Sequence, residues 1–240
     1  MNRITSFLTV GLMAILAPLA QANIEISWKI GATTGNCGAG TATLLQCAPI
    51  TVGGITITGL SGFSNSPGSV TAEQFSSTLN VSSTGATPTT TVEIWVASDG
   101  FSSPVTPPDI LFASSLTSDS TLGAGNSNLT SCVDTPNVGV PNGSPVASPF
   151  CAGATHYALS NIQENYSGVS SLANSTSMPI SSLAKFYTLS QDITISLGSG
   201  SSMHVNTSDV LTQVPEPGAI VLFGTVLAMC ASRLRRRDRV

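Results

Sequence analysis

The chain has very little charge. Charged residues make up 8% of its 240 residues, well below the fraction usual on a soluble surface. Between residues 23 and 213, Lys29 and Lys185 are the only basic residues, against ten carboxylates. A surface that is acidic and nearly free of cations repels phosphate backbones, so nucleic-acid binding is excluded. Serine, threonine and asparagine side chains must therefore do most of the solvating.

The residues on which most catalytic and metal sites depend are also scarce. His156 and His204 are the only histidines, and neither lies in a metal-binding spacing such as HExxH. There is no GxSxG nucleophile elbow and no phosphate-binding GxxxxGK. We therefore expect no catalytic residue, no metal and no cofactor, in a protein that is not an enzyme. A secreted hydrolase stays open as an alternative, because paired carboxylates drawn from Glu73, Glu93 and Glu164 would be set by space rather than by sequence.

Three aspartates offer the remaining candidate for a metal site. Asp99, Asp109 and Asp119 lie in or near expected turns and could surround a calcium ion. No EF-hand or similar repeat spacing supports such a site. Turn formation by their side chains is the stronger interpretation.

The N-terminus has the pattern of a secretory signal. Residues 1–22 contain one basic residue, Arg3, an apolar stretch over residues 7–19, and Ala20-Gln21-Ala22 before Asn23. A basic start, an apolar middle and a small-x-small exit predict export and cleavage after Ala22. A retained N-terminal membrane helix is the alternative, although the apolar stretch is short.

The C-terminus combines three features in a fixed order. Val-Pro-Glu-Pro occupies residues 214–217, an uncharged apolar run covers 219–231, and five arginines follow. A helix over residues 218–232 would be about 22 Å long, short of a hydrocarbon core of roughly 30 Å. Snorkelling arginines or a thinned bilayer can make up that deficit. We expect a transmembrane helix with its basic tail in the cytoplasm and residues 23–213 outside; an ordinary tail anchor is the alternative.

In this order the three features resemble the PEP-CTERM sorting signal of Gram-negative bacteria. The resemblance is confined to residues 214–240 and says nothing about the fold or activity of the exported part. It implies recognition by an exosortase, a membrane-embedded processing enzyme, followed by transfer to the cell surface or the exopolysaccharide matrix. The residues that match the signal are Pro215, Glu216, Pro217, Arg233, Arg235, Arg236 and Arg237.

Four cysteines lie in the part of the chain expected to be exported. An even number in an oxidising compartment predicts disulfides, and four cysteines permit three pairings. No pair has CxxC spacing, which disfavours metal binding. We expect Cys37 to pair with Cys47 and Cys132 with Cys151, because each pair brackets a stretch rich in glycine or proline.

Period-two alternation of apolar and polar residues predicts an all-β ectodomain, an antiparallel β-sandwich of about eight strands. The ectodomain is expected to cover residues 23–207, with a linker at 208–214 and the sorting signal at 215–240. The strands are expected at residues 24–30, 50–58 with a turn or bulge at its Gly-Gly, 75–82, 91–98, 110–116, 155–162, 186–191, 192–197 and 203–205.

The two tryptophans are the best candidates for contact with a ligand. Trp28 shares one face of its expected strand with three isoleucines, which predicts a place in the core. Trp95 points away from Ile94 and Val96 and is the candidate platform for a sugar ring, with burial in a second layer as the alternative.

These patterns predict an exported, non-enzymatic envelope or matrix protein, anchored by its C-terminal helix and associated with exopolysaccharide or biofilm. A carbohydrate-binding module that recognises the producer's own exopolysaccharide is the alternative from another class. The expected partners are the exosortase, the membrane through residues 218–232, and the polysaccharide.

Overall fold

The computed structural model describes residues 24–40, 43–68, 71–84, 90–135 and 155–214, together with Thr225. In the described ranges from residue 24 to 214, every regular element is a β-strand, which confirms the all-β prediction. The strands are β1 (Ile24–Ile30), β2 (Thr33–Gly40), β3 (Leu44–Gln46), β4 (Ile50–Val52), β5 (Ile55–Thr58), β6 (Ser61–Ser64), β7 (Thr71–Ser83), β8 (Thr90–Phe101), β9 (Ile110–Leu122), β10 (Gly125–Thr135), β11 (Thr155–Tyr166), β12 (Ser170–Ile180), β13 (Tyr187–Leu197) and β14 (Ser202–Gln213).

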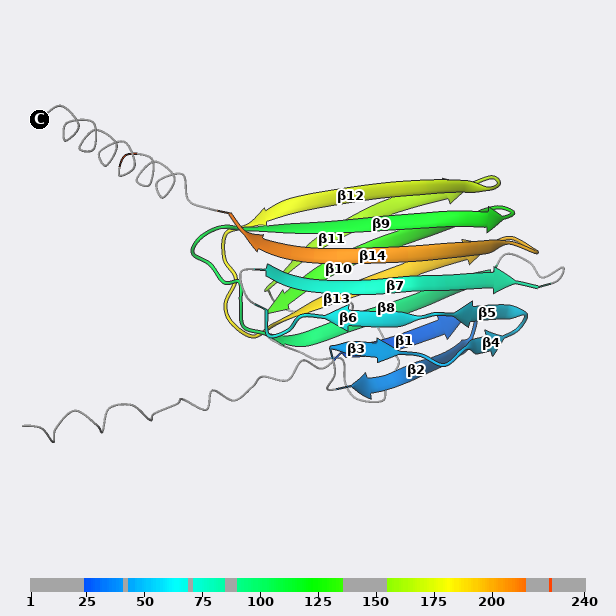
Figure 1. The fold of residues 1–240 in the computed structure, drawn as a ribbon, viewed down its shortest axis with the longest axis horizontal. Helices are drawn as coiled ribbons and strands as arrows, with labels where there is room; N and C mark the ends of the chain where they lie inside the picture. Colours follow the sequence, from blue (N-terminus) through cyan, green and yellow to red (C-terminus); the bar gives the residue numbers. More distant parts are fainter. Residues whose placement is uncertain are drawn as a thin grey trace, which may run out of the picture.

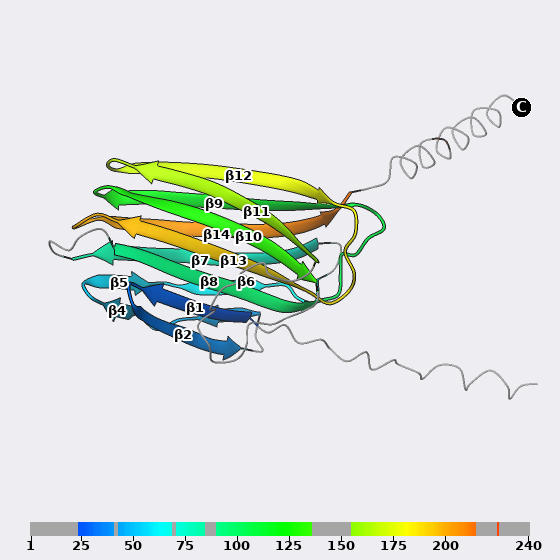
Figure 2. The same cartoon turned by 180° about the vertical axis from the view of Figure 1, so that it is seen from behind.

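The strands form two antiparallel sheets packed face to face. Sheet A has the order β11-β10-β13-β8-β1-β2, and sheet B has the order β12-β9-β14-β7-β5-β4. The short β6 also pairs with β7, and β3 pairs with β6. Sheet B lies in front in Figure 1, and sheet A faces the viewer in Figure 2. This is the sandwich architecture that the alternating pattern predicts.

Most consecutive long strands lie in opposite sheets. β7 and β8, β9 and β10, β11 and β12, and β13 and β14 each place one strand in sheet B and one in sheet A. These four pairs of strands follow one another in the same order in both sheets: β11 and β12 lie at one edge, followed by β10 and β9, then β13 and β14, then β8 and β7. Distant parts of the chain are therefore neighbours, and the core depends on pairings far apart in sequence.

Both ends of the described domain leave from the same end of the sandwich. Ile24 at the start of β1 pairs with Ser98 near the end of β8. Residues 102–109 connect β8 to β9, and the Val214 amide donates to the Asp109 carbonyl over 2.8 Å. The first and the last strand thus begin and end beside the β8–β9 connection, on the left in Figure 1.

Side chains that point between the sheets form two apolar clusters with a polar layer between them. Along β14, Met203 and Val205 belong to the larger cluster and Leu211 to the smaller one, with Thr207 and Asp209 in between. Along β9, β10 and β13, too, a polar inward residue separates residues of the larger cluster from residues of the smaller one. We call this layer the polar belt; its buried members are Gln74, Ser76, Ser114, Ser131, Gln191, Thr207 and Asp209.

Hydrogen bonds of the polar belt cross from one sheet to the other. The hydroxyls of Ser114 on β9 and Ser131 on β10 lie 2.7 Å apart. The Gln74 side-chain amide on β7 donates to the Val96 carbonyl on β8 over 3.0 Å. Such pairing offsets the desolvation of buried polar groups and fixes how the sheets align.

Several predictions about individual elements were wrong. The described ranges hold fourteen strands rather than about eight. Residues 208–213 are not a linker, because they continue β14, which pairs with β7 and β9 on its two sides. The two strands expected at 186–191 and 192–197 are one strand, β13. The Gly53–Gly54 turn between β4 and β5 is confirmed, and both glycines have positive φ.

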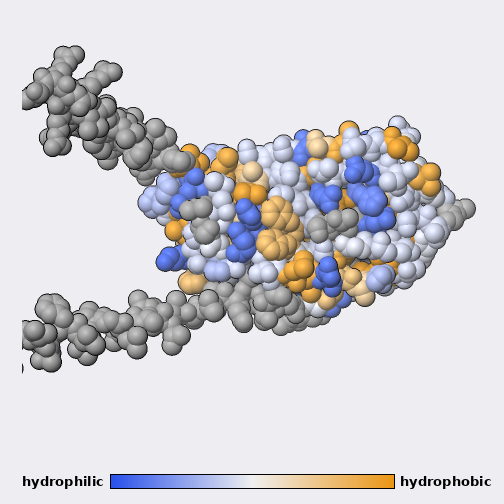
Figure 3. Space-filling model, in the orientation of Figure 1, coloured by the Kyte–Doolittle hydropathy of each residue, from blue (hydrophilic) through white to orange (hydrophobic). Residues whose placement is uncertain are grey.

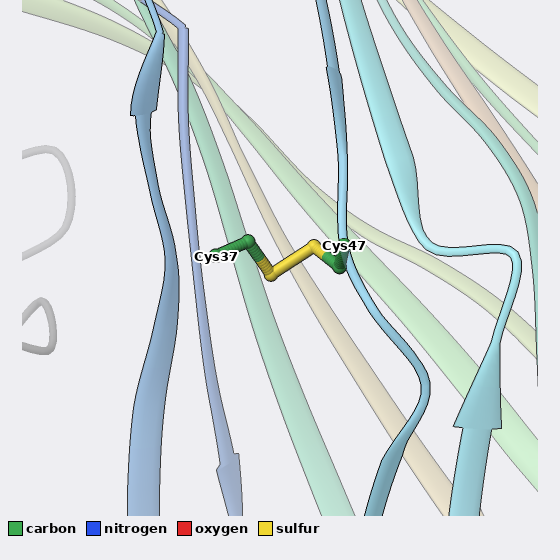
Figure 4. Close-up of a disulfide and its surroundings, with 2 residues drawn as sticks. All are labelled: Cys37 and Cys47. Carbon is green, nitrogen blue, oxygen red and sulfur yellow. A yellow bond between two sulfur atoms is a disulfide. The ribbon is translucent and has the colours of Figure 1, made fainter.

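A disulfide joins β2 to the segment after β3, as the sequence predicts. Cys37 is bonded to Cys47 with 5.1 Å between their Cα atoms (Figure 4). Both side chains pack, partly buried, against the larger apolar cluster. Cys132 is also disulfide-bonded. Its expected partner Cys151 lies outside the described residues, so that pairing stays a prediction.

Removing the Cys37–Cys47 disulfide should lower the free energy of unfolding by about 3 kcal/mol, because the reduced chain regains the entropy of an open loop. The change is Cys37→Ala with Cys47→Ala, measured by urea unfolding of the full chain. Thr51→Ala on the neighbouring β4 is the control and should shift stability by less than about 0.5 kcal/mol. A double variant as stable as the parent would contradict this role for the bond.

Candidate functional site

Trp95, the residue that the sequence predicts to contact a ligand, lies on the outer face of sheet A. In the register of β1, β8 and β13, Trp95 lies between Ser27 and Asp192. Trp95 is half-buried, so its ring is neither a fully exposed platform nor a core side chain. The alternation along β8 places it opposite the fully buried Ile94 and Val96, as predicted.

Asp192 is the polar neighbour that orients Trp95. Burial, followed by the negative charge of Glu93, raises the pKa of Asp192 to about 6, while a hydrogen bond from the Trp95 side chain and the charge of Lys29 act the other way. The indole N–H is a donor only, so the carboxylate holds one edge of the ring. Within the described chain, the Asp192 Oδ1 atom and the Ser27 hydroxyl have no hydrogen-bond partner.

The next row of this face contains an ion pair. Lys29 on β1 donates to both carboxylate oxygens of Glu93 on β8, at 2.9 and 3.1 Å. The side chains are 39% and 29% exposed, so the pair is partly screened by solvent and adds little to stability. It neutralises one of the few cations of the ectodomain, which leaves the face acidic.

Two further carboxyl groups, those of Glu25 and Asp99, lie on the other side of Trp95. Glu25 pairs in register with Ala97, two residues from Trp95 along β8. Glu25 is 7% exposed; burial, and then the charge of Asp99, raises its pKa to about 7. Glu25 and Asp192 were not predicted as site residues, because only the strand register brings them beside Trp95.

Together these groups favour weak contacts with a neutral sugar. A partly exposed indole stacks on the apolar face of a sugar ring, and the partly exposed Lys29 and Glu93 side chains can hydrogen-bond to hydroxyl groups at its edge. An acidic face repels anionic polysaccharides.

The opposite face of the sandwich, formed by sheet B, is mostly pale in Figure 3, as expected of serine and threonine, with separate orange patches. Its exposed apolar side chains include Leu44, Phe63, Leu111 and Leu172.

The other candidate residues do not come together. Trp28 is partly buried against the larger apolar cluster, and its ring covers Gly35, where a Cβ would lie 2.3 Å from the indole. Glu93 lies on the outer face of sheet A, and Glu73 belongs to β7 of sheet B and accepts from the Thr71 hydroxyl. Glu164 is 3% exposed and bonded to the Tyr166 hydroxyl at 2.8 Å. These three glutamates therefore form no catalytic pair.

The three aspartates considered for calcium cannot bind one ion. Asp109 and Asp119 lie near opposite ends of β9, about 33 Å apart on an extended strand. Asp99 belongs to β8 in the other sheet. In the described part of the chain, no group of three or more histidine, cysteine, aspartate or glutamate side chains could hold a metal ion. His204 on β14 pairs in register with Asn80 on β7 and with Asp119 on β9.

The sorting-signal residues, the cleavage residues Ala20 and Ala22, and Cys151 lie outside the described residues. Of the expected membrane segment at 218–232, only Thr225 is described. Among the residues that are described, no helix has the length and apolar character needed to cross a bilayer. The two termini therefore remain predictions from the sequence.

Comparison with known proteins adds no relative. No protein-family model matches the chain, and no curated protein matches its sequence.

Proposed function

We propose that the protein is an exported, non-enzymatic component of the cell envelope or extracellular matrix. Its C-terminal helix anchors it until an exosortase processes it near Pro215–Pro217, and it then joins the exopolysaccharide or biofilm matrix. The observation that carries this proposal is the ordered set of Pro-Glu-Pro, apolar run and arginine cluster at residues 215–240, opposite an N-terminal signal. The hydroxyl-rich composition of the ectodomain is compatible with hydrated polysaccharide surroundings.

The end of the folded domain supports processing at this position. β14 ends at Gln213, two residues before Pro215, and Val214 is 42% exposed. Cutting the chain beyond Val214 removes no described strand and no member of either apolar cluster. A processed ectodomain would therefore keep its core.

Replacing Pro215, Glu216 and Pro217 with alanine should leave export intact while the anchored, unprocessed form accumulates in the membrane fraction. The reason is that the processing enzyme loses its recognition motif, while the signal peptide and the apolar helix are unchanged. Immunoblots of membrane and culture fractions measure the two forms. Thr212→Ala with Gln213→Ala, immediately before the motif, is the control and should be released normally. Equal release of both variants would remove the sorting proposal.

A second candidate function is carbohydrate binding at the outer face of sheet A, favoured by the half-buried Trp95 beside Asp192. Trp95→Ala should weaken retention of the mature protein on the matrix polysaccharide about tenfold or more, since one stacking contact of about 1.4 kcal/mol is worth that factor. Affinity electrophoresis in gels containing the polysaccharide measures this. Phe63→Ala, an aromatic 37% exposed on sheet B, is the matched control. No retention of the parent protein on any neutral or acidic polysaccharide would end this candidate.

A further inference from the structure

The centre of the polar belt brings a hydroxyl and a carboxamide into contact across the two sheets. The Thr207 hydroxyl on β14 donates to the Gln191 side-chain oxygen on β13 over 2.7 Å. The Ser76 hydroxyl lies 2.5 Å from the same threonine oxygen. Thr207 is 4% exposed and Gln191 is fully buried, so water has little access to either group. The Thr207 hydroxyl, which can act as a nucleophile, therefore contacts the Gln191 carboxamide, which can act as an acyl donor, in a site with little access for water.

A carboxyl group lies beside this pair. Asp209 follows Thr207 on the same inward face of β14 and is 0% exposed. Burial raises its pKa to about 7, while side-chain hydrogen bonds from Ser131, Ser114 and Gln191 lower it. None of these three neighbours is ionisable at neutral pH. Asp209 can therefore exist in both protonation states near pH 7, which suits a group that accepts and returns a proton.

The hydrogen bonding of the centre is incomplete. By strict geometry neither Asp209 oxygen nor the Gln191 Nε2 atom has a hydrogen-bond partner among the described residues, although looser side-chain hydrogen bonds from Ser131, Ser114 and Gln191 still lower the pKa of Asp209. An amide nitrogen held only by a hydrogen bond of poor geometry is costly to bury in a dry core. A reaction that expelled this nitrogen would remove the poorly bonded group and keep the oxygen atoms of the belt.

We propose that Thr207 and Gln191 form an intramolecular ester that joins β14 of sheet B to β13 of sheet A. The Thr207 oxygen attacks the Gln191 Cδ atom after a rotation of the amide, and the C–N bond to Nε2 breaks. Asp209 takes the hydroxyl proton and returns it to the departing nitrogen, which leaves as ammonia. No oxidant or other reactant is needed, and the dry surroundings protect the product from hydrolysis.

The mass of the protein tests this directly. After reduction and alkylation, the mature protein should be lighter by one ammonia, about 17 Da, than the mass calculated for its alkylated sequence. Cleavage before aspartate separates Gln191 from Asp192 and yields peptides 134–191 and 192–208. These two peptides should remain joined and should separate after mild alkaline hydrolysis of the ester. A protein of full mass with separate peptides overturns the proposal.

Two substitutions identify the reacting groups. Thr207→Val keeps the shape of the side chain and Asp209→Asn keeps its size, and both should restore the full mass. Ser118→Ala, a buried serine on β9 outside the belt centre, is the control and should keep the cross-link. Ammonia loss that persists in Thr207→Val would assign the modification to another residue, such as an asparagine, and overturn the ester. An unchanged cross-link in Asp209→Asn would overturn the proton transfer by Asp209.

Discussion

Replacing Phe101 with alanine should lower the free energy of unfolding by about 3–5 kcal/mol, because the change removes a buried ring and leaves a cavity. Phe101 is 0% exposed and belongs to the smaller apolar cluster. Its ring stacks on that of Tyr187, with 5.5 Å between the centroids and 13° between the planes. Tyr187 is itself fully buried, so few groups can move to fill the space.

Urea unfolding of the full chain, followed by tryptophan fluorescence, measures this loss. Phe186→Ala is the matched control, since Phe186 is the same residue type in the adjacent connection and is 55% exposed. Its substitution should change stability by less than about 1 kcal/mol. Equal effects of the two substitutions would show that the smaller cluster contributes little to the fold.

The free energy of unfolding should fall as the pH rises from about 4 to about 8. Burial holds the pKa of Asp209 at about 7, against an ordinary value of 3.8. In this interval the folded state keeps a proton that the unfolded state has lost, so each step up in pH favours unfolding. The stabilisation is complete below the unfolded pKa and is lost as the pH rises through the folded one. A shift of this size corresponds to roughly 4 kcal/mol. Glu25 and Asp192, whose pKa values are also raised, act in the same direction.

Urea midpoints at pH 5 and pH 8 test this prediction, and the quantity compared is the difference between the two pH values. Asp209→Asn removes the titrating group at nearly constant volume and should reduce that difference by roughly a third to a half, since Glu25 and Asp192 supply the rest. Asp119→Asn on the outward side of β9 is the control and should leave the difference unchanged. Stability that rises with pH would mean that Asp209 is ionised in the folded protein.

The strands that could be predicted are those whose inward residues are apolar. β1 was predicted to the residue, because Ile24, Ile26 and Ile30 alternate with polar residues and point into the core. β10 was missed because Ser127 and Ser131 take inward positions beside Leu129, and all three are buried. An inward serine is indistinguishable from an outward one by hydropathy. β12 was not among the expected strands because it is an edge strand, exposed along most of its length and without a repeating apolar face.

The candidate site shows the same limit at the level of single residues. The outward direction of Trp95 follows from the alternation along its own strand, and that part was predicted. Its neighbours Ser27 and Asp192 come from β1 and β13. Pairing register depends on the whole sheet, and no local pattern contains it. The polar belt was missed for the same reason, since Thr207 and Gln191 are contributed by different sheets.

The central place of β14 has a mechanical consequence. The chain leaves this strand at Gln213 toward the expected anchor, and β14 is bonded along its length to β7 on one side and β9 on the other. A pulling force between the anchor and the turns at the other end of the sandwich would act on β14 along its own axis. The hydrogen bonds of both ladders lie across that axis, so they would be loaded together in shear rather than opened one after another. Detachment under tension is governed by the unfolding rate, and a tether fixed to a strand held on both sides should make that rate slow.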